Sequence, residues 1–310
     1  MGMLVEGQWV KKSVMTRDKK GTYDRPPRTF RDFIGHDHPV FKPESDRYHL
    51  YVSYACPWAT RTLIYRHLKG LAEHISVSVV HPDMLDEGWQ FDGSYPGATE
   101  DHLFGSRYLR EVYLKAQPDI TTSVTVPVLW DKKTQTIVNN ESSEIIRMFN
   151  SSFNDLTGNR DDYYPEARRP EIDELNDIIY HAVNNGVYRA GFAKTQEAYD
   201  EAVTSLFKAL DDLDQRLAHQ PFLLGEEITE ADLRLIPTLL RFDLVYVVHF
   251  KCNVKQIKDY PHLRRYTKQL YELPAITKST QLDHIKRHYY YSHAGINPNR
   301  IIPRGPDEIF

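Results

Sequence analysis

Cys56 and Pro57 are the residues of this 310-residue chain whose types and positions most directly suggest chemistry. A thiolate is a nucleophile. A cysteine at the start of a helix meets unpaired backbone N–H groups and the positive end of the helix dipole, which favour the charged form. Proline suits the first position of a helix because it has no N–H to satisfy there. The pair therefore predicts a reactive thiol at a helix N-terminus, although an isolated cysteine is more often buried and inert.

The neighbouring residues predict the elements that hold this thiol. From Tyr48 to Val52, aromatic and β-branched side chains alternate, which is typical of a strand. The segment after Pro57 contains no helix breaker before Gly70 and carries apolar residues at helical spacing. A second β-branched run, Ile75 to Val80, follows. Strand, helix and strand at this spacing form a βαβ unit with parallel strands, and the thiol lies at its first strand-to-helix junction.

Composition and charge argue against several classes of function. A chain with 41% hydrophobic and 26% charged residues is ordinary for a globular protein of two domains. The net charge of -4, with scattered Lys and Arg, predicts no surface for nucleic acid or an anionic membrane. No apolar run is long enough to cross a bilayer. The two cysteines, Cys56 and Cys252, suggest no disulfide framework, so we expect the reducing cytoplasm. The 14 histidines show no ligand spacing, so no metal is predicted.

Two long segments lack a clear periodic pattern. Residues 1–47 combine charges and prolines with isolated aromatic residues, and we expect an extended arm with little regular structure. Residues 81–122 interrupt the βαβ pattern and hold one short predicted helix, Arg107 to Lys115. A run this long between elements is more often functional or disordered than neutral. Trp89 within it packs on the core or lines a pocket, and packing is the commoner role.

A predicted hairpin and a predicted helix follow. Val126 to Trp130 and Thr136 to Val138 form two strands joined by a polar turn. Pro127 removes a ladder donor from the first strand, and a cis bond there would leave neighbouring backbone groups free for an extended peptide. The polar run 139–144 precedes an apolar helix, Ile145 to Phe149. Its Asn, Ser and Glu residues are explained either by helix capping or by a site for a ligand carboxylate.

Beyond residue 150 the pattern becomes helical. Residues 151–170 are polar, contain glycine and prolines, and predict a linker. An apolar stripe at steps of three and four then predicts a long helix. The stripe consists of Ala202, Leu206, Leu210, Leu213 and Leu217. Thr229 and Asp232 have capping-box spacing, with Asp in place of the usual Glu, before another apolar run. No strand of comparable strength is predicted here, so we expect an all-helical second half.

The order of these parts resembles that of the glutathione transferases. The resemblance implies an α/β thioredoxin-like domain followed by an all-α domain, with Cys56 as the active-site cysteine. Val126 and Pro127 match the cis-proline turn that pairs with the glutathione backbone, and Glu141 with Ser142 matches the pair that holds its γ-glutamyl end. The expected limits are an N-terminal extension over 1–47, a glutathione-binding domain over 48–155 with its insertion at 81–122, a helical domain over 156–290 and a tail over 291–310.

Longer segments narrow the resemblance. They are YVSYACPWATRTLI, TVPVLWDKK, NNGVYRAGF, RFDLVYVVHFKC and DHIKRHYYYSHAGINP, and they are similar to the xi class, the glutathionyl-hydroquinone reductases. This implies that Tyr188, Tyr246 and Tyr289 face the cysteine from the helical domain. Without it, each of the 20 tyrosines is more simply a packing residue. Implied glutathione contacts are Trp89, Ser123, Val124, Thr125 and Val126. The class carries a basic residue in place of Ser123, so that contact involves the backbone only or is lost.

The xi-class resemblance implies reduction of S-glutathionyl-hydroquinones with glutathione as co-substrate. Cys56 attacks the glutathionyl sulfur, the hydroquinone leaves, and a second glutathione releases glutathione disulfide from the mixed disulfide. Tyr188 is the expected proton donor, and Tyr246 and Tyr289 hold the ring hydroxyls. A homodimer formed through the helical domains is also implied. Two alternatives stay open: a glutathione-conjugating or glutaredoxin-like thiol transferase, and a non-enzymatic interaction module of the same fold.

Overall fold

The computed structural model describes residues 2–11, 16–17, 21–24 and 27–306, and it divides into two compact units. Unit 1 consists of Met1–Val14, Pro26–Asp161 and Lys278–His288. Unit 2 consists of Met15–Arg25, Asp162–Thr277 and Tyr289–Phe310. These limits differ from the predicted domains, because the described residues 16–17 and 21–24 belong to unit 2 and residues 278–288 belong to unit 1.

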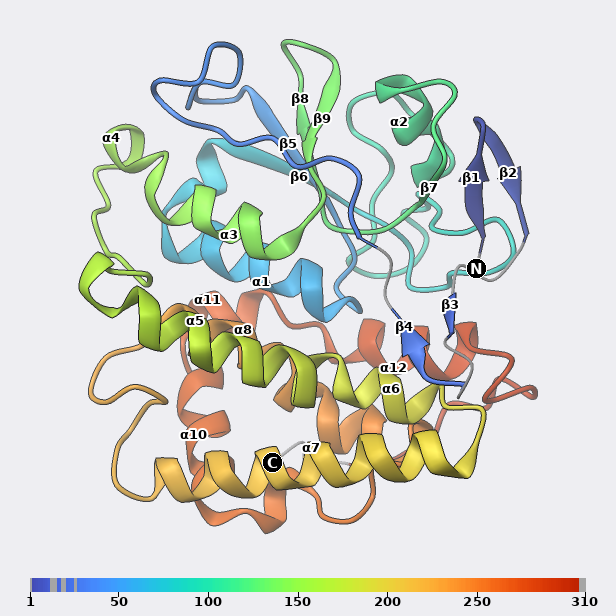
Figure 1. Ribbon diagram of the computed structural model, residues 1–310. Helices are drawn as coiled ribbons and strands as arrows, with labels where there is room; N and C mark the ends of the chain where they lie inside the picture. Colours follow the sequence, from blue (N-terminus) through green and yellow to red (C-terminus); the bar gives the residue numbers. More distant parts are fainter. Residues whose placement is uncertain (1, 12–15, 18–20, 25–26, 307–310) are drawn as a thin grey trace. The chain divides into compact units, whose positions relative to one another are not determined.

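Unit 1 is built on a four-stranded sheet with the order β6-β5-β8-β9 (Figure 1). Its strands are β5 (Tyr48–Val52), β6 (Ile75–Val79), β8 (Val128–Asp131) and β9 (Thr136–Asn139). β5 pairs in parallel with β6 and antiparallel with β8, and β8 forms an antiparallel hairpin with β9. The predicted βαβ unit and hairpin are confirmed. The hairpin begins two residues later than predicted, so Val126 and Pro127 lie in the loop before it.

Three helices of unit 1 position the functional segments. They are α1 (Pro57–Leu68), α2 (Leu109–Ala116) and α3 (Ser142–Ser151). α1 and α3 pack against each other beside the sheet (Figure 1). α1 ends before Gly70, whose φ of 68° places it in the left-handed region that favours glycine. α3 begins at Ser142 rather than Ile145 because Glu141 caps it.

The N-terminal arm has more regular structure than the sequence predicts. In unit 1, β1 (Met3–Val5), β2 (Gln8–Val10) and β7 (Thr122–Ser123) form an antiparallel sheet with the order β2-β1-β7. In unit 2, β3 (Thr16–Arg17) pairs with β4 (Tyr23–Asp24). The Asp32 N–H donates to the Val138 carbonyl at 3.0 Å, so the arm also covers the edge of β9. The expectation of little regular structure is therefore wrong for these segments.

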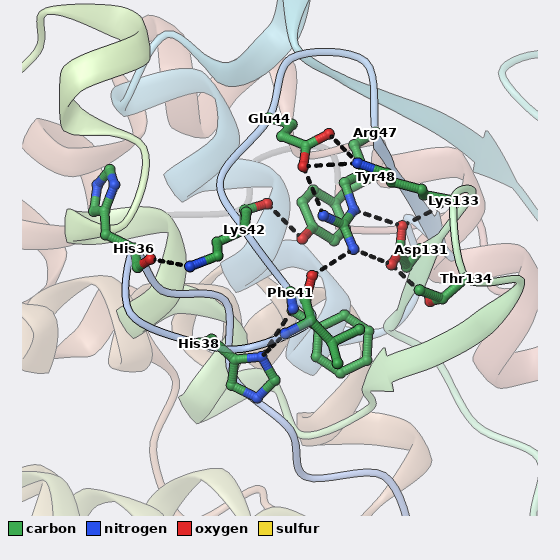
Figure 2. A network of polar contacts seen from close by, with 11 residues as sticks. His36, His38, Phe41, Lys42, Glu44, Arg47, Tyr48, Asp131, Lys133 and Thr134 are labelled. Carbon is green, nitrogen blue, oxygen red and sulfur yellow. Dashed lines mark hydrogen bonds and ion pairs between the residues drawn. The ribbon is translucent and has the colours of Figure 1, made fainter.

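A buried ion pair between Arg47 and Asp131 connects the last residues of the N-terminal arm to strand β8 (Figure 2). The Arg47 guanidinium donates to both carboxylate oxygens of Asp131, at 2.9 and 2.6 Å. It also donates to Glu44 at 2.8 Å and to the Val40 carbonyl at 2.9 Å. Thr134 donates to the same aspartate at 2.7 Å. The Arg47 and Asp131 side chains are 4% and 0% exposed, so the pair is shielded from water.

We expect replacement of Asp131 by asparagine to lower the free energy of unfolding by about 3–5 kcal/mol, because the buried Arg47 charge loses its partner. Urea unfolding followed by circular dichroism measures the loss. The neighbouring Lys132 provides a control, because it pairs at 2.6 Å with an Asp46 side chain that is 82% exposed. Lys132→Ala should cost less than about 1 kcal/mol. Equal losses in the two variants would contradict the prediction.

The same ion pair predicts a pH dependence. Burial alone would raise the pKa of Asp131, but hydrogen bonds from Arg47, Thr134 and the Lys133 N–H outweigh it and hold the pKa below its usual value. The folded state therefore binds this proton less tightly than the unfolded chain does. The contribution of the pair to stability is complete above about pH 4 and is lost as the pH falls further. The stability difference between wild type and Asp131→Asn should accordingly shrink on acidification.

Unit 2 consists mainly of helices (Figure 1). They include α5 (Arg169–Ile178), α6 (Gly186–Gly191), α7 (Gln196–Leu217), α8 (Glu230–Arg241), α9 (Val247–His249), α10 (Pro261–Tyr271) and α11 (Pro274–Lys278). α8 is buried along nearly its whole length. Its predicted capping box is confirmed, since the Thr229 N–H donates to Asp232 at 2.8 Å. In the described part of the chain, no helix has both the length and the apolar character needed to cross a membrane.

The predicted linker 151–170 holds the boundary between the two units, at Asp161 and Asp162, and no helix covers residues 158–165. Its ends are helical, because it also contains the end of α3, the short helix α4 (Asn154–Thr157) and the start of α5. The sequence Asn184-Asn185-Gly186, which suggests a helix end, instead lies where a π-helical segment, η3 (Ile179–Asn184), passes into α6. Asn and Gly residues predict a break locally, but the helical path continues here, and Asn184 donates its side chain to Thr238 of α8 at 2.8 Å.

Candidate active site

The thiol of Cys56 lies between β5 and α1, as predicted. Cys56 is the N-cap residue of α1, its backbone is extended, and Pro57 occupies the first helical turn. Its N–H donates to the Ser53 carbonyl at 3.1 Å, which closes the turn after β5. The side chain is partly exposed. The first turn of α1, which the structure describes completely, holds no acidic residue to oppose a thiolate.

The Val126–Pro127 loop lies beside this thiol, and its peptide bond is cis. The distance from Cys56 Sγ to the Val126 carbonyl oxygen is 3.6 Å. A thiol donates weakly to such an oxygen, whereas a thiolate has no hydrogen to donate. The Val126 carbonyl oxygen has two lone pairs, so it is able to accept a hydrogen bond from a ligand N–H beside the thiol.

Glu141 and Ser142 lie at the start of α3. Glu141 Oε1 accepts hydrogen bonds from the Ser143 N–H and hydroxyl, each at 3.0 Å. Burial alone would raise the pKa of Glu141, but the Ser143 N–H and the positive charges of Arg28 and Arg61 outweigh it and hold the pKa below its usual value. The carboxylate is therefore ionised at neutral pH. Its capping role accounts for the residue type, as one of the two sequence interpretations proposed.

α2 connects the segments predicted to contact glutathione. The hydroxyl of Tyr113 donates to the Thr125 carbonyl at 2.8 Å and accepts from Asn140 Nδ2 at 3.2 Å. At the start of the same helix, the Leu109 N–H donates to the Trp89 carbonyl at 3.0 Å. Tyr113 is fully buried. Sequence reasoning missed this residue, because nothing local distinguishes it from the other tyrosines.

Trp89 and Ser123 have different surroundings. Trp89 is 6% exposed and stacks on the ring of His288, with ring centroids 4.8 Å apart and an interplanar angle of 20°. Ser123 lies in β7, opposite Met3 of β1. Val124, which follows, is largely buried. Ser123 brings no positive charge to this strand, in agreement with the departure from the class that the sequence shows.

The hydroxyls of the three predicted tyrosines form a chain within unit 2. The distance between the hydroxyl oxygens is 2.5 Å for Tyr188 and Tyr289, and 3.0 Å for Tyr289 and Tyr246. Tyr246 and Tyr289 are 0% and 1% exposed, whereas Tyr188 is partly exposed. Burial raises the pKa of Tyr246 and of Tyr289 well above the usual value, so both phenols stay neutral and able to donate. Tyr188 is the outer end of the chain.

Two π-helical segments orient these tyrosines. η3 precedes Tyr188, and η4 (Phe242–Tyr246) ends with Tyr246 itself. A π turn inserts an extra residue into a helix and occurs frequently at functional sites. Asn184 at the end of η3 donates to the Thr238 hydroxyl of α8 at 2.8 Å, so a buried hydrogen bond ties η3 to the helix that leads into η4.

Gly191 leaves space for the Phe250 ring, which packs against the rings of the three tyrosines. A Cβ on Gly191 would lie 2.2 Å from Cγ of Phe250, so no larger residue fits there. The Phe250 ring packs against all three tyrosines, with ring-centroid distances of 5.4, 5.3 and 5.6 Å to Tyr188, Tyr246 and Tyr289. Tyr289 itself belongs to α12 (Leu282–Ser292). Cys56 belongs to unit 1, and its expected proximity to the tyrosines stays a prediction.

The second cysteine, Cys252, and the potential metal ligands lie outside the proposed site chemistry. Cys252 is fully buried, and burial raises the pKa of its thiol well above the usual value, as is typical of a structural cysteine. Among the described residues, no group of three or more His, Cys, Asp or Glu side chains is arranged to hold a metal ion.

Known proteins resemble this chain over nearly its whole length. It matches the models "Glutathione S-transferase, N-terminal domain" over residues 55–152 and "Glutathione S-transferase, C-terminal domain" over 196–269. It is 52% identical over 313 residues to glutathionyl-hydroquinone reductase YqjG of Escherichia coli K12, covering 99% of this chain and 95% of that protein. It is also 52% identical over 296 residues to glutathione S-transferase omega-like 2 of Schizosaccharomyces pombe, covering 93% and 94%.

Solved structures specify the class. The crystal structure of glutathione-S-transferase Xi from Phanerochaete chrysosporium has a TM-score of 0.93 and 51% identity, covering 96% of each chain. The chain belongs to the xi class of glutathione transferases. The glutathione-bound structure of YqjG also matches this xi-class chain, with a TM-score of 0.91 and 50% identity over 99% of this chain and 96% of that one. The predicted glutathione transferase fold is therefore confirmed for this xi-class protein.

Proposed function

We propose that this xi-class chain is a glutathionyl-hydroquinone reductase that uses Cys56 as its nucleophile. One observation carries the proposal: a partly exposed cysteine caps α1 and lies 3.6 Å from the carbonyl next to Pro127. A thiolate in this position forms disulfides with glutathionyl groups, which a serine or tyrosine cannot do. The 52% identity to a glutathionyl-hydroquinone reductase supports the same assignment.

The first half-reaction breaks the carbon–sulfur bond of the substrate. The Cys56 thiolate attacks the sulfur of the S-glutathionyl-hydroquinone and forms a mixed disulfide. The electron pair of the carbon–sulfur bond passes to the ring carbon, which takes up a proton and leaves as part of the hydroquinone. Because a bare carbanion is a poor leaving group, protonation must accompany bond cleavage.

The second half-reaction regenerates the thiolate. A second glutathione, as its thiolate, attacks the glutathionyl sulfur of the mixed disulfide. Glutathione disulfide leaves, and Cys56 returns to its anionic form. The net reaction consumes one glutathione per hydroquinone released and follows ping-pong kinetics.

We assign the proton donation to Tyr188. A phenol that donates its hydrogen to the substrate becomes a stronger donor when it accepts a hydrogen bond itself. Tyr289 is able to supply that bond, and Tyr246 is able to supply one to Tyr289, because either hydroxyl of each short contact can be the donor. We assign Tyr246 a role through Tyr289. This differs from the initial expectation that both inner tyrosines hold ring hydroxyls directly.

We assign glutathione to the segments around Cys56. The backbone of Thr125 and Val126 pairs with the tripeptide, Glu141 with Ser142 holds its γ-glutamyl end, and Trp89 packs against it. The ionised Glu141 carboxylate supports this assignment, because it complements the γ-glutamyl ammonium group. Ser123 and Val124 contribute backbone contacts only.

Turnover of an S-glutathionyl-hydroquinone in the presence of glutathione tests the proposal. Equal amounts of hydroquinone and glutathione disulfide should appear, as measured by liquid chromatography. A parallel assay offers glutathione and an aryl halide to the enzyme. Conjugation at a rate above that of hydroquinone release would instead identify a conjugating transferase.

Tyr113→Phe should raise the KM for glutathione about tenfold with little change in kcat. The lost hydroxyl leaves the half-buried Thr125 carbonyl and the buried Asn140 amide without this partner, which costs about 1–3 kcal/mol and loosens two glutathione-binding segments. Steady-state kinetics with glutathione as the varied substrate measure the effect. Tyr48→Phe is a matched control, since its buried hydroxyl donates to the Lys42 carbonyl at 2.7 Å, at the end of β5 away from Cys56. That variant should lose stability without a change in KM.

We also propose that the protein is a cytoplasmic homodimer, as the xi-class resemblance implies. Sedimentation velocity measures the oligomeric state. A monomer at micromolar concentration would refute the dimer without affecting the proposed chemistry.

A further inference from the structure

Trp89 lies in a segment without a regular helix or strand. Between β6 and α2, the described backbone is held by isolated bridges and by single hydrogen bonds, such as those from the His81 N–H to the Gln90 carbonyl and from the Phe91 N–H to the Arg107 carbonyl, each at 2.9 Å. The Trp89 backbone is held by its carbonyl, which accepts from the Leu109 N–H at 3.0 Å. Rotation of the indole about its side-chain bonds requires a separate restraint.

His288 supplies that restraint from almost 200 positions later in the chain. Its ring stacks on the Trp89 indole at a centroid distance of 4.8 Å and an angle of 20°. His288 Nδ1 lies 2.8 Å from the Pro82 carbonyl oxygen. Because a carbonyl only accepts, Nδ1 carries the hydrogen, and the bond fixes the plane of the imidazole ring. Because the imidazole plane is fixed, the indole that stacks on it is restrained in its orientation.

The neighbouring residue strengthens the same attachment. Arg287 donates to both carboxylate oxygens of Asp83, at 2.7 and 2.8 Å. A bidentate pair of this kind restrains orientation as well as distance. Arg287 and His288 thus connect the segment Lys278–His288, which belongs to unit 1, to Pro82 and Asp83.

We propose that His288 is a positioning residue of the glutathione site, which holds the Trp89 indole in the orientation that contacts the tripeptide. The inference rests on the proposed function, because that function gives Trp89 its ligand. His288 acts through Trp89 and takes no part in carbon–sulfur cleavage. Its loss should therefore weaken glutathione binding and leave the chemical step unchanged.

The test replaces His288 by leucine, which keeps volume but removes the ring and its hydrogen bond, and by phenylalanine, which keeps the ring. Calorimetric titration with reduced glutathione gives Kd, and steady-state kinetics give KM and kcat. His288→Leu should raise Kd and KM about three- to tenfold, the range for a lost aromatic pair, with kcat within about twofold. His288→Phe should restore most of the affinity. An unchanged Kd in the leucine variant overturns the proposal.

His284 is a matched control. It is a histidine of the same helix, and its Nε2 lies 2.7 Å from the Pro96 carbonyl of the same segment, but its ring packs on Tyr54 and Tyr95 rather than on Trp89. His284→Leu should leave Kd within about twofold. An equal rise in Kd for both variants would indicate general loosening of the segment and would refute a specific role for His288.

A double-mutant cycle decides whether His288 acts through the indole. In a Trp89→Leu background, His288→Leu should add no further rise in Kd, because its target is already gone. Additive effects would overturn the proposal. Since glutathione titration involves no hydroquinone, this result is independent of whether the proposed reductase activity is correct.

Discussion

Replacement of Cys56 by serine is expected to lower hydroquinone release roughly a thousandfold or more, to the background rate. The reaction requires a nucleophile that is anionic near neutral pH and that forms a bond to sulfur which a second thiol can later break. A serine hydroxyl meets neither requirement. The backbone of the α1 N-terminus is unchanged by the substitution, so glutathione binding should persist while turnover is lost.

Mass spectrometry distinguishes loss of chemistry from loss of structure. Wild-type protein incubated with the S-glutathionyl-hydroquinone should carry one glutathione on Cys56, and the serine variant should carry none. Cys252→Ala is the control, because this second thiol is buried and has no role in the reaction. It should retain turnover within about twofold. Full activity of the Cys56→Ser variant would reject the nucleophile assignment.

The thiol half of the site could be predicted because its signals are local. Alternation from Tyr48 to Val52, Pro57 after the cysteine and the break at Gly70 each act within a few residues, and the structure confirms the elements that they predict. The isomer of the Val126–Pro127 bond was not accessible from sequence, because tertiary context decides between cis and trans.

The arm was misjudged because its partners are distant in sequence. β1 is three residues long and pairs with β7, more than a hundred positions later, and Asp32 pairs with β9 in the same way. Strands this short show no usable alternation. Tyr113 and His288 were missed for a similar reason, since their importance arises from a hydroxyl contact and a ring contact made only in the folded chain.

The tyrosine chain shows how a family resemblance and a structure complement each other. Resemblance selected Tyr188, Tyr246 and Tyr289 from 20 tyrosines, although the Asn-Asn-Gly sequence before Tyr188 suggests a helix end. In the structure η3 and α6 are nearly continuous there, and Asn184 is bonded to α8 rather than capping a terminus. The order of the chain, from the partly exposed Tyr188 to the buried Tyr246, was not accessible from sequence.

The second large effect is expected for Tyr188→Phe, which should slow carbon–sulfur cleavage about a hundredfold, the lower range for loss of a general acid. The variant keeps the ring and its packing on Phe250 but has no hydrogen to donate to the leaving carbon. Single-turnover mixing of the enzyme with the S-glutathionyl-hydroquinone, without free glutathione, isolates this step. The KM for glutathione in the second half-reaction should stay within about twofold, and a loss confined to glutathione binding would reject the proton-donor role.

Substitution of Tyr289 or Tyr246 should slow carbon–sulfur cleavage less than substitution of Tyr188 does. Tyr289→Phe removes the bond that Tyr188 accepts and should slow cleavage about tenfold, the value of one hydrogen bond. Tyr246→Phe lies one step further away and should have a smaller effect. Tyr199→Phe is the control, because its hydroxyl donates to the Lys251 carbonyl at 2.7 Å and is not part of the tyrosine chain.

Burial keeps the pKa of Tyr246 and Tyr289 well above its usual value, so the contribution of these two phenols should not decline as the pH rises from 7 toward about 10. Equal losses for Tyr246→Phe and Tyr188→Phe would indicate that the inner phenol contacts the substrate itself, and the relay from Tyr246 through Tyr289 to Tyr188 would then be wrong.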